Sequence, residues 1–133
     1  MKKPLTTACV LACLAVQPGF AAPAAQPPRP AEATAPYDGE LVRLAEILGS
    51  LHYLRNVCGA REGQKWRNQM QDLIDAEQLD GERKRKVVAS FNRGYRVFQQ
   101  TYRTCTPAAD IAIRRYLDEG AKISRDITAR YAN

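Results

Sequence analysis

The sequence has 133 residues, with 20 lysines and arginines against 14 aspartates and glutamates and a formal charge of +6. This length suits one domain and excludes a (β/α)8 barrel, which needs about 250 residues. Of the 8 prolines, only Pro107 lies beyond residue 36. The chain therefore divides into a leader rich in proline and alanine and a body that is almost free of proline.

The beginning of the leader has the layout of a secretory signal peptide. Lys2 and Lys3 are followed by the apolar stretch Leu5 to Val16, which is shorter than the roughly 20 residues of a membrane-spanning helix. A break and two small residues then favour cleavage between Ala21 and Ala22. We therefore expect export of the protein and removal of this signal peptide.

The segment after the cleavage site, residues 22–36, is dominated by proline and alanine. Such a composition cannot build a hydrophobic core, so we expect a disordered, extended spacer. A lipoprotein is the alternative for the leader, because Val10-Leu11-Ala12-Cys13 loosely resembles a lipid-attachment box. The apolar stretch continues past Cys13, however, which favours ordinary cleavage near Ala21 and Ala22.

Export also changes the argument from charge. Loss of Lys2 and Lys3, with no acidic residue, reduces the formal charge of +6 by two. The basic residues of the body do not alternate with aromatic residues on one face, as a groove for single-stranded nucleic acid requires. We therefore expect no nucleic-acid partner and no transmembrane helix in the mature chain.

Residues 37–133 show helical periodicity almost throughout and no sustained alternation of period two. The first helix is expected to run from Asp38, as its N-cap, to Cys58, where Gly59 stops it. The second is expected to end near Gln78. The apolar stripes of these two helices are Leu44, Ile47, Leu48, Leu51, Leu54 and Cys58 in the first, and Trp66, Met70, Leu73 and Ile74 in the second.

The third and fourth helices have the clearest patterns. Thr106 is the expected N-cap of the fourth, with Pro107 at its first helical position. In the third helix, apolar residues recur in alternating steps of three and four, as in a heptad seam: Val88, Phe91, Tyr95, Phe98, Tyr102 and Cys105. The expected inner stripe of the fourth is Ile113, Leu117, Gly120, Ile127 and Tyr131, and its outer face alternates in charge through Arg114, Asp118, Lys122, Asp126 and Arg130.

Short connections make sequential helices antiparallel, so we predict an all-α, up-down-up-down four-helix bundle. Cleavage of the leader leaves Cys58 and Cys105, at the ends of the first and third helices, which lie at one pole of such a bundle. An oxidising compartment favours a structural disulfide between them. A redox-active or metal-binding pair is the alternative, but no Cys-X-X-Cys motif and no second histidine complete a zinc set.

Motifs that carry chemistry are absent from the sequence. His52 is the single histidine, and a haem site using His52 and Met70 is outweighed by ordinary packing roles. There is no glycine-rich phosphate loop, no haem-attachment motif and no nucleophile elbow. We therefore predict no catalytic residue, metal or cofactor. The sequence does not decide whether the protein is an enzyme, but the absence of a catalytic motif favours a non-enzymatic role.

Three features could bind a ligand. Arginines turned away from the apolar seam can hold carboxylates or phosphates, and Gly94 beside them predicts close helix packing. The run Arg83-Lys84-Arg85-Lys86 opens the third helix, where cations oppose the helix dipole, so it is either a solvated first turn or a site for anionic lipid or glycan. The third feature is a set of polar and aromatic residues around the cysteines: His52, Tyr53, Arg55, Glu62, Gln64, Trp66 and Arg103. The arginines turned away from the apolar seam are Arg93, Arg96 and Arg103.

Several of these motifs resemble one protein family. They are Leu51-His52-Tyr53-Leu54-Arg55 before Cys58-Gly59, Glu62-Gly63-Gln64 with Trp66-Arg67, Phe91-Asn92-Arg93-Gly94-Tyr95-Arg96, Thr101-Tyr102-Arg103 and Cys105-Thr106-Pro107-Ala108-Ala109. The family consists of small exported alphaproteobacterial proteins, conserved hypothetical proteins with a domain of unknown function. The resemblance covers nearly all of residues 37–133. It implies a Gram-negative periplasm, supports pairing Cys58 with Cys105, and carries no activity.

Together these observations predict a non-enzymatic periplasmic module that binds another component of the cell envelope, foremost a protein. One alternative is a cell-wall enzyme, or an inhibitor of one, acting through the pole of Cys58. The other is a binder of anionic lipid or glycan at residues 83–86. The sequence predicts no particular oligomeric state.

Overall fold

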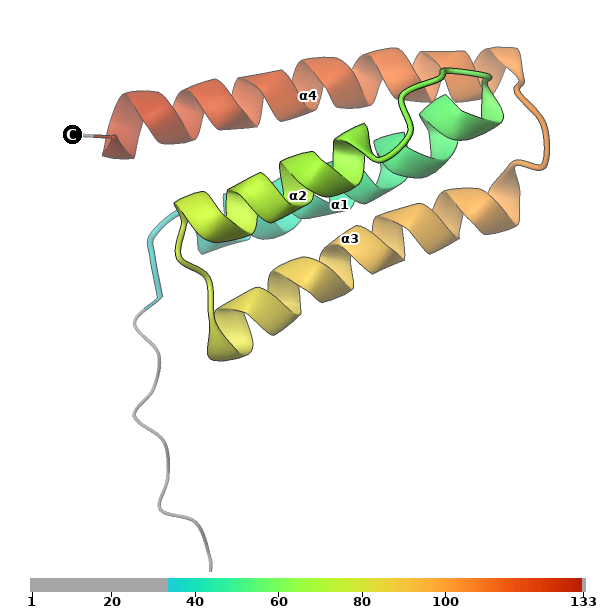
Figure 1. Cartoon of the computed structure of the whole chain (residues 1–133). Helices are drawn as coiled ribbons and strands as arrows, with labels where there is room; N and C mark the ends of the chain where they lie inside the picture. Colours follow the sequence, from blue (N-terminus) through green and yellow to red (C-terminus); the bar gives the residue numbers. More distant parts are fainter. Residues whose placement is uncertain (1–33, 133) are drawn as a thin grey trace, which may run out of the picture. The chain divides into compact units, whose positions relative to one another are not determined.

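A computed structural model describes residues 34–132, which contain four α-helices and no strand (Figure 1). The all-helical prediction is therefore confirmed for these residues. The predicted signal peptide and nearly all of the predicted spacer lie outside them. The helices are α1 (Asp38–Val57), α2 (Lys65–Ala76), α3 (Gly81–Thr101) and α4 (Pro107–Tyr131).

α1 is the central helix of the fold. It contacts each of the other three helices, most extensively α3, and in Figure 1 it lies between α3 and α4 and behind α2. A helix that is covered on several sides buries apolar residues around much of its circumference. The apolar side chains that α1 buries are Leu41, Ala45, Ile47, Leu48, Leu51 and Leu54.

The other helices complete the core from one face each. α2 buries the predicted stripe except for the half-buried Leu73. The buried residues packed around α1 are Trp66, Met70, Ile74, Leu79, Val87, Phe91, Ala109 and Ile113.

No helix within residues 34–132 combines the length and the apolarity needed to cross a membrane.

α4 begins as the sequence predicts. Thr106 has an extended backbone, and its Oγ1 accepts a hydrogen bond from the N–H of Ala109 at 3.2 Å. Pro107 follows in the first turn. Backbone N–H groups in this turn have no carbonyl partner within the helix, so the missing N–H of proline costs no hydrogen bond. This cap orients the first turn of α4, which carries Asp110.

The start of α1 differs from the prediction, whereas the C-terminal ends of α1 and α2 agree with it. Tyr37, and not Asp38, is the N-cap of α1; the Asp38 carboxylate instead accepts a hydrogen bond from the backbone N–H three residues before it. α2 ends at Ala76, near Gln78 as predicted, because Gln78 has a φ of +48° that a right-handed helix cannot include. Gly59, with a φ of +79°, lies just after α1 as expected.

α3 faces α1 with smaller residues than the predicted seam. Val88, the first residue of that seam, is 36% exposed. α3 ends at Thr101, so the last seam positions, Tyr102 and Cys105, lie in the connection to α4. The seam was wrong at Val88 because a close approach at Gly94 decides which face of α3 meets α1, whereas Tyr102 still packs against the core from outside the helix. That face is Val87, Ser90, Phe91 and Gly94.

The backbones of α1 and α3 touch at this crossing. A Cβ built at Gly94 would lie 2.1 Å from the carbonyl oxygen of Glu46, and one built at Gly49 would lie 1.9 Å from that of Phe91. No side chain fits between the helices at these points. The predicted close packing at Gly94 is therefore confirmed, and Gly49 is its counterpart on α1.

α4 packs on α1 along a narrow stripe. Ile113 and Gly120 are buried, and Ile127 is half-buried. Leu117 and Tyr131, which were predicted on the same stripe, are each 37% exposed. Among the described helices, α4 makes its extensive contacts with α1 alone. One neighbouring helix covers only part of the predicted stripe, and Leu117 and Tyr131 lie outside the covered part.

The charged face of α4 forms one of the expected pairs within the helix. Lys122 and Asp126 lie 2.6 Å apart. Arg130 does not continue the row of side-chain pairs along the helix, because its Nη2 donates to Glu40 of α1 at 2.6 Å. Exposed pairs of this kind contribute a few tenths of a kcal/mol each, so the face adds little to stability.

Candidate functional site

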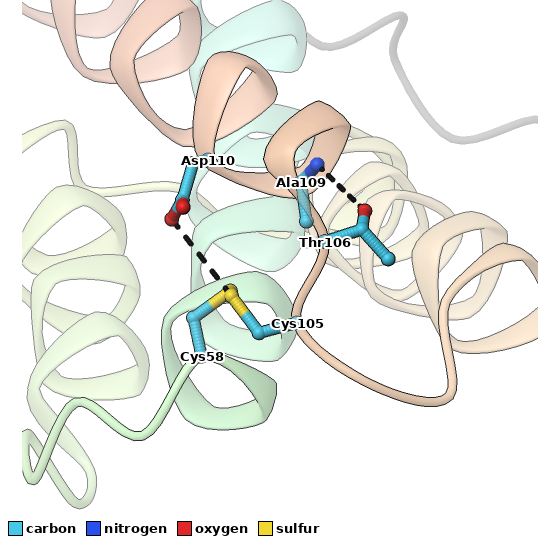
Figure 2. Close-up of a disulfide and its surroundings, with 5 residues drawn as sticks. All are labelled: Cys58, Cys105, Thr106, Ala109 and Asp110. Carbon is cyan, nitrogen blue, oxygen red and sulfur yellow. Dashed lines mark hydrogen bonds between the residues drawn. A yellow bond between two sulfur atoms is a disulfide. The ribbon is translucent and has the colours of Figure 1, made fainter.

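Cys58 and Cys105 form a disulfide, as their sequence positions predict (Figure 2). Their Cα atoms are 4.6 Å apart. Cys58 directly follows α1, and Cys105 lies two residues before α4 instead of at the end of α3. Cys58 is half-buried and Cys105 is exposed. The bridge therefore ties the end of α1 to the start of α4.

Arg55, Glu62 and Trp66 form a cluster that joins α1 to α2. The Arg55 guanidinium donates to both Glu62 oxygens, from Nε at 3.0 Å and from Nη2 at 2.5 Å, and Trp66 Nε1 donates at 2.7 Å. The hydrogen bonds from Arg55, followed by that from Trp66, lower the pKa of Glu62 to about 2. Fixed donors therefore occupy this carboxylate, and it works as a clamp between helices.

Replacing Glu62 by glutamine is expected to lower the free energy of unfolding at pH 7 by about 1.5 kcal/mol, because hydrogen bonds to a charged group are lost. The pKa of Glu62 is lower in the folded protein than in the unfolded chain, so its stabilisation is present above about pH 4.5 and is lost as the pH falls toward 2. Urea unfolding followed by circular dichroism at several pH values measures this difference.

The matched control is Asp118→Asn, which neutralises an exposed carboxylate on α4 and should change stability by less than about 0.5 kcal/mol. The gap between wild type and Glu62→Gln should narrow as the pH approaches 2. A gap that stays constant over this range would show that the clamp is not ionic.

His52 packs between helices and is not open to solvent on all sides. Its Nε2 accepts a hydrogen bond from Arg67 Nε at 3.1 Å, and its ring lies 5.6 Å from that of Tyr95. Burial, and then the Arg67 charge, lower the pKa of His52, so the imidazole is neutral at pH 7. Arg67 is missing from the predicted site because no local pattern links it to a residue 15 positions away.

Tyr53 belongs to an aromatic cluster that connects α1, α3 and α4. Its hydroxyl donates to the backbone oxygen of Tyr102, and its ring meets that of Tyr95 edge-on at 5.3 Å. Phe98 stacks on Tyr102 at 5.9 Å and meets Tyr116 edge-on at 5.6 Å. These rings pack against one another, so Tyr53 has a structural role in the protein.

The structure separates Arg93 from the pole, the end of the fold that carries Cys58 and Cys105, whereas Arg103 lies two residues before Cys105 at this pole. Arg93 donates from Nη2 to Glu46, in the middle of α1, at 3.0 Å. Arg96, on α3, and Arg103, in the connection to α4, are exposed. Neither forms a hydrogen bond or an ion pair with another residue of the described range. The predicted site therefore consists of two groups with different surroundings.

Arg93 belongs to a row of ion pairs that crosses three helices. Glu46 also lies 3.5 Å from Arg43 Nη1, and Arg43 donates to both oxygens of Glu119 on α4, at 2.7 Å and 2.9 Å. The hydrogen bonds from Arg43 lower the pKa of Glu119. Arg43 and Glu119 are 76 residues apart in sequence, so only the fold brings them together.

The basic run at residues 83–86 is partly neutralised by neighbouring acids. Arg83 donates from Nη2 to Asp38 at 2.7 Å, and Lys86 pairs with Glu82 at 2.9 Å. These four residues border a cavity of about 450 Å³ between the starts of α1 and α3. Lys84, Arg85 and Lys86 are all exposed, so three cations of the run face solvent.

Comparison with known proteins places the whole helical body in one family. No curated protein and no solved structure matches the chain. The model of a family described as "Protein of unknown function (DUF2385)" matches residues 36–131. That range holds all four helices, both bridged cysteines and every residue of the predicted site. The protein therefore belongs to the DUF2385 family.

Proposed function

We propose that this protein is exported to the periplasm and acts there as a non-enzymatic module that binds another envelope protein. Export is supported by the layout of residues 1–21 as a signal peptide, followed by the spacer 22–36 and the helical domain 37–133. The Cys58–Cys105 disulfide supports it too, since such bridges persist in oxidising compartments. The alphaproteobacterial origin implied by the resemblance belongs to the same proposal.

The up-down-up-down order of the helices is also part of this proposal. Short connections between helices favour antiparallel neighbours. The disulfide joins the end of α1 to the connection that follows α3, and this requires those two ends to lie at the same pole. Both observations support a compact scaffold that presents its outer helix faces to a partner.

One observation carries the binding role. Val97 on α3 is 49% exposed, beside the exposed Arg96 and one turn after Arg93, whose side chain is 56% exposed. Arginine is enriched in protein interfaces, and apolar side chains form their centres. We call Arg93, Arg96 and Val97 the α3 surface. Its charge suits an acidic patch on the partner protein.

Observed contacts favour this surface over the alternatives. Glu62 would be the acid of a cell-wall enzyme, but its oxygens are bound and its pKa of about 2 lies below the range of a general acid working near neutral pH. At the proposed lipid or glycan site, Arg83 and Lys86 are paired within the protein. The α3 surface combines the exposed Val97 with Arg96, which forms no ion pair with another residue of the described range.

The proposal is tested with a photo-crosslinking amino acid at position 97 of the exported protein in living cells. We expect one discrete adduct with an acidic envelope protein, and we expect Arg96→Glu to reduce it severalfold through charge repulsion. The purified partner should then bind the purified wild type with a salt-dependent affinity.

Two matched controls accompany this experiment. Arg114→Glu reverses an exposed arginine on α4, and a crosslinker at position 68 lies on the exposed face of α2. Arg114→Glu should leave the adduct from position 97 unchanged, and position 68 should not yield it. No adduct from position 97, or an adduct that Arg96→Glu leaves at full yield, would overturn the binding role of the α3 surface.

A further inference from the structure

A carboxylate lies against the disulfide. Oδ1 of Asp110, in the first turn of α4, is 3.8 Å from Sγ of Cys105, and Figure 2 shows this contact beside the bridge. A disulfide sulfur carries no proton, so in the oxidised protein it cannot donate to the carboxylate. The thiol of the reduced protein would donate to it, and the thiolate could share a cation with it.

The direction of Asp110 is set by the helix that carries it. The Thr106 cap and Pro107 define the first turn of α4, and Asp110 is the fourth residue of that helix. One ligand atom each from Cys58, Cys105 and Asp110 lies within 4.8 Å of the other two. Cys105 and Asp110 are exposed, so both a reductant and an ion can reach the group.

We propose that Cys58, Cys105 and Asp110 form a binding site for a thiophilic divalent cation such as Zn²⁺ when the disulfide is reduced. Two thiolates and one carboxylate are ordinary zinc ligands, and a water molecule can take the fourth tetrahedral position. Zn–S bonds of about 2.3 Å place two thiolate sulfurs about 3.8 Å apart. The separated sulfurs therefore reach this geometry with a small movement of the chain.

The chemistry balances with a dithiol as the reductant. The protein disulfide accepts two electrons and two protons and becomes two thiols, while the dithiol becomes a disulfide. Zinc then displaces the two thiol protons as it binds both sulfurs, and the Asp110 carboxylate supplies the third protein ligand. The disulfide and the zinc site are therefore alternative states of the same residues. Each state holds the end of α1 to the start of α4.

The experiment titrates Zn²⁺ into the dithiol-reduced protein, freed of reductant without air, against a chromophoric chelator. We expect one zinc ion per chain in the reduced protein and none in the oxidised protein, since the thiolate is the metal ligand. Asp110→Asn should weaken zinc binding at least about tenfold, the scale of losses seen when groups around a metal are replaced. Co²⁺ in place of Zn²⁺ should give thiolate-to-metal charge-transfer absorption.

Asp118→Asn is the matched control, because Asp118 is an exposed aspartate two turns further along α4, and it should bind zinc like the wild type. Zinc should also raise the urea midpoint of the reduced wild type more than that of reduced Asp110→Asn. If reduction unfolds the chain and the thiolates alone capture the metal, Asp110→Asn will bind with unchanged affinity. That result, or the absence of stoichiometric binding, overturns the proposal.

Discussion

Replacing Cys58 and Cys105 together by serine is expected to lower the free energy of unfolding by about 4 kcal/mol. The bridge closes a loop of 47 residues, and the chain-entropy model assigns about 4 kcal/mol to a loop of this size. A domain of this length has a total stability of about 5–15 kcal/mol, so the loss is a large part of it. Urea unfolding of the two proteins, followed by circular dichroism, measures the difference.

Reduction provides the control for this prediction. The wild type treated with a dithiol, in a chelator that removes metal ions, should unfold at the lower urea concentration of the double-serine variant. The variant itself should not respond to the dithiol, because its two bridging sulfurs are absent. Equal urea midpoints for the oxidised wild type and the variant would contradict a stabilising role for the bridge.

Gly94→Ala is expected to lower the free energy of unfolding by about 2 kcal/mol. Alanine is a better helix former than glycine by about 1 kcal/mol, but overpacking costs up to about 3 kcal/mol. The new Cβ would lie 2.1 Å from the carbonyl oxygen of Glu46. A backbone atom on a neighbouring helix cannot rotate away as a side chain can, so α1 and α3 must separate and the clash wins.

Gly39→Ala is the matched control, since a Cβ at Gly39 meets no atom within 4 Å. This variant should be as stable as the wild type or slightly more stable. Gly49→Ala should behave like Gly94→Ala, because its Cβ would lie 1.9 Å from the Phe91 carbonyl oxygen. Thermal and urea unfolding of the three variants compare them directly. A Gly94→Ala protein as stable as Gly39→Ala would contradict the close crossing.

The candidate site divides according to what each side chain contacts. Glu62 and His52 drew attention because of their residue types, but both are engaged in contacts between helices. Arg96 and Val97 face solvent. Only Arg96 of these two belongs to the predicted site, because the sequence pattern does not show that Val97 is left uncovered by the other helices.

Local signals explain which parts of the fold could be predicted from the sequence. Helical periodicity located the helices, and Thr106-Pro107 located the start of α4, because a cap is made by neighbouring residues. The pairing of Cys58 with Cys105 followed from counting the cysteines outside the predicted signal peptide. α2 ends near Gln78 as predicted, and the left-handed conformation of Gln78 prevents the helix from continuing.

The sequence by itself therefore determined that the body is helical and where its helices lie, since these depend on composition and nearby residues. The count of cysteines outside the predicted signal peptide indicated which two are bridged. Only the tertiary structure decided that α1 is central, that Gly49 and Gly94 bring two backbones into contact, and that Asp110 faces the disulfide. Such contacts depend on the shapes of two segments that meet in space. A large apolar residue such as Val88 can look like a core position and still be exposed, because a close crossing elsewhere decides which face of α3 is covered.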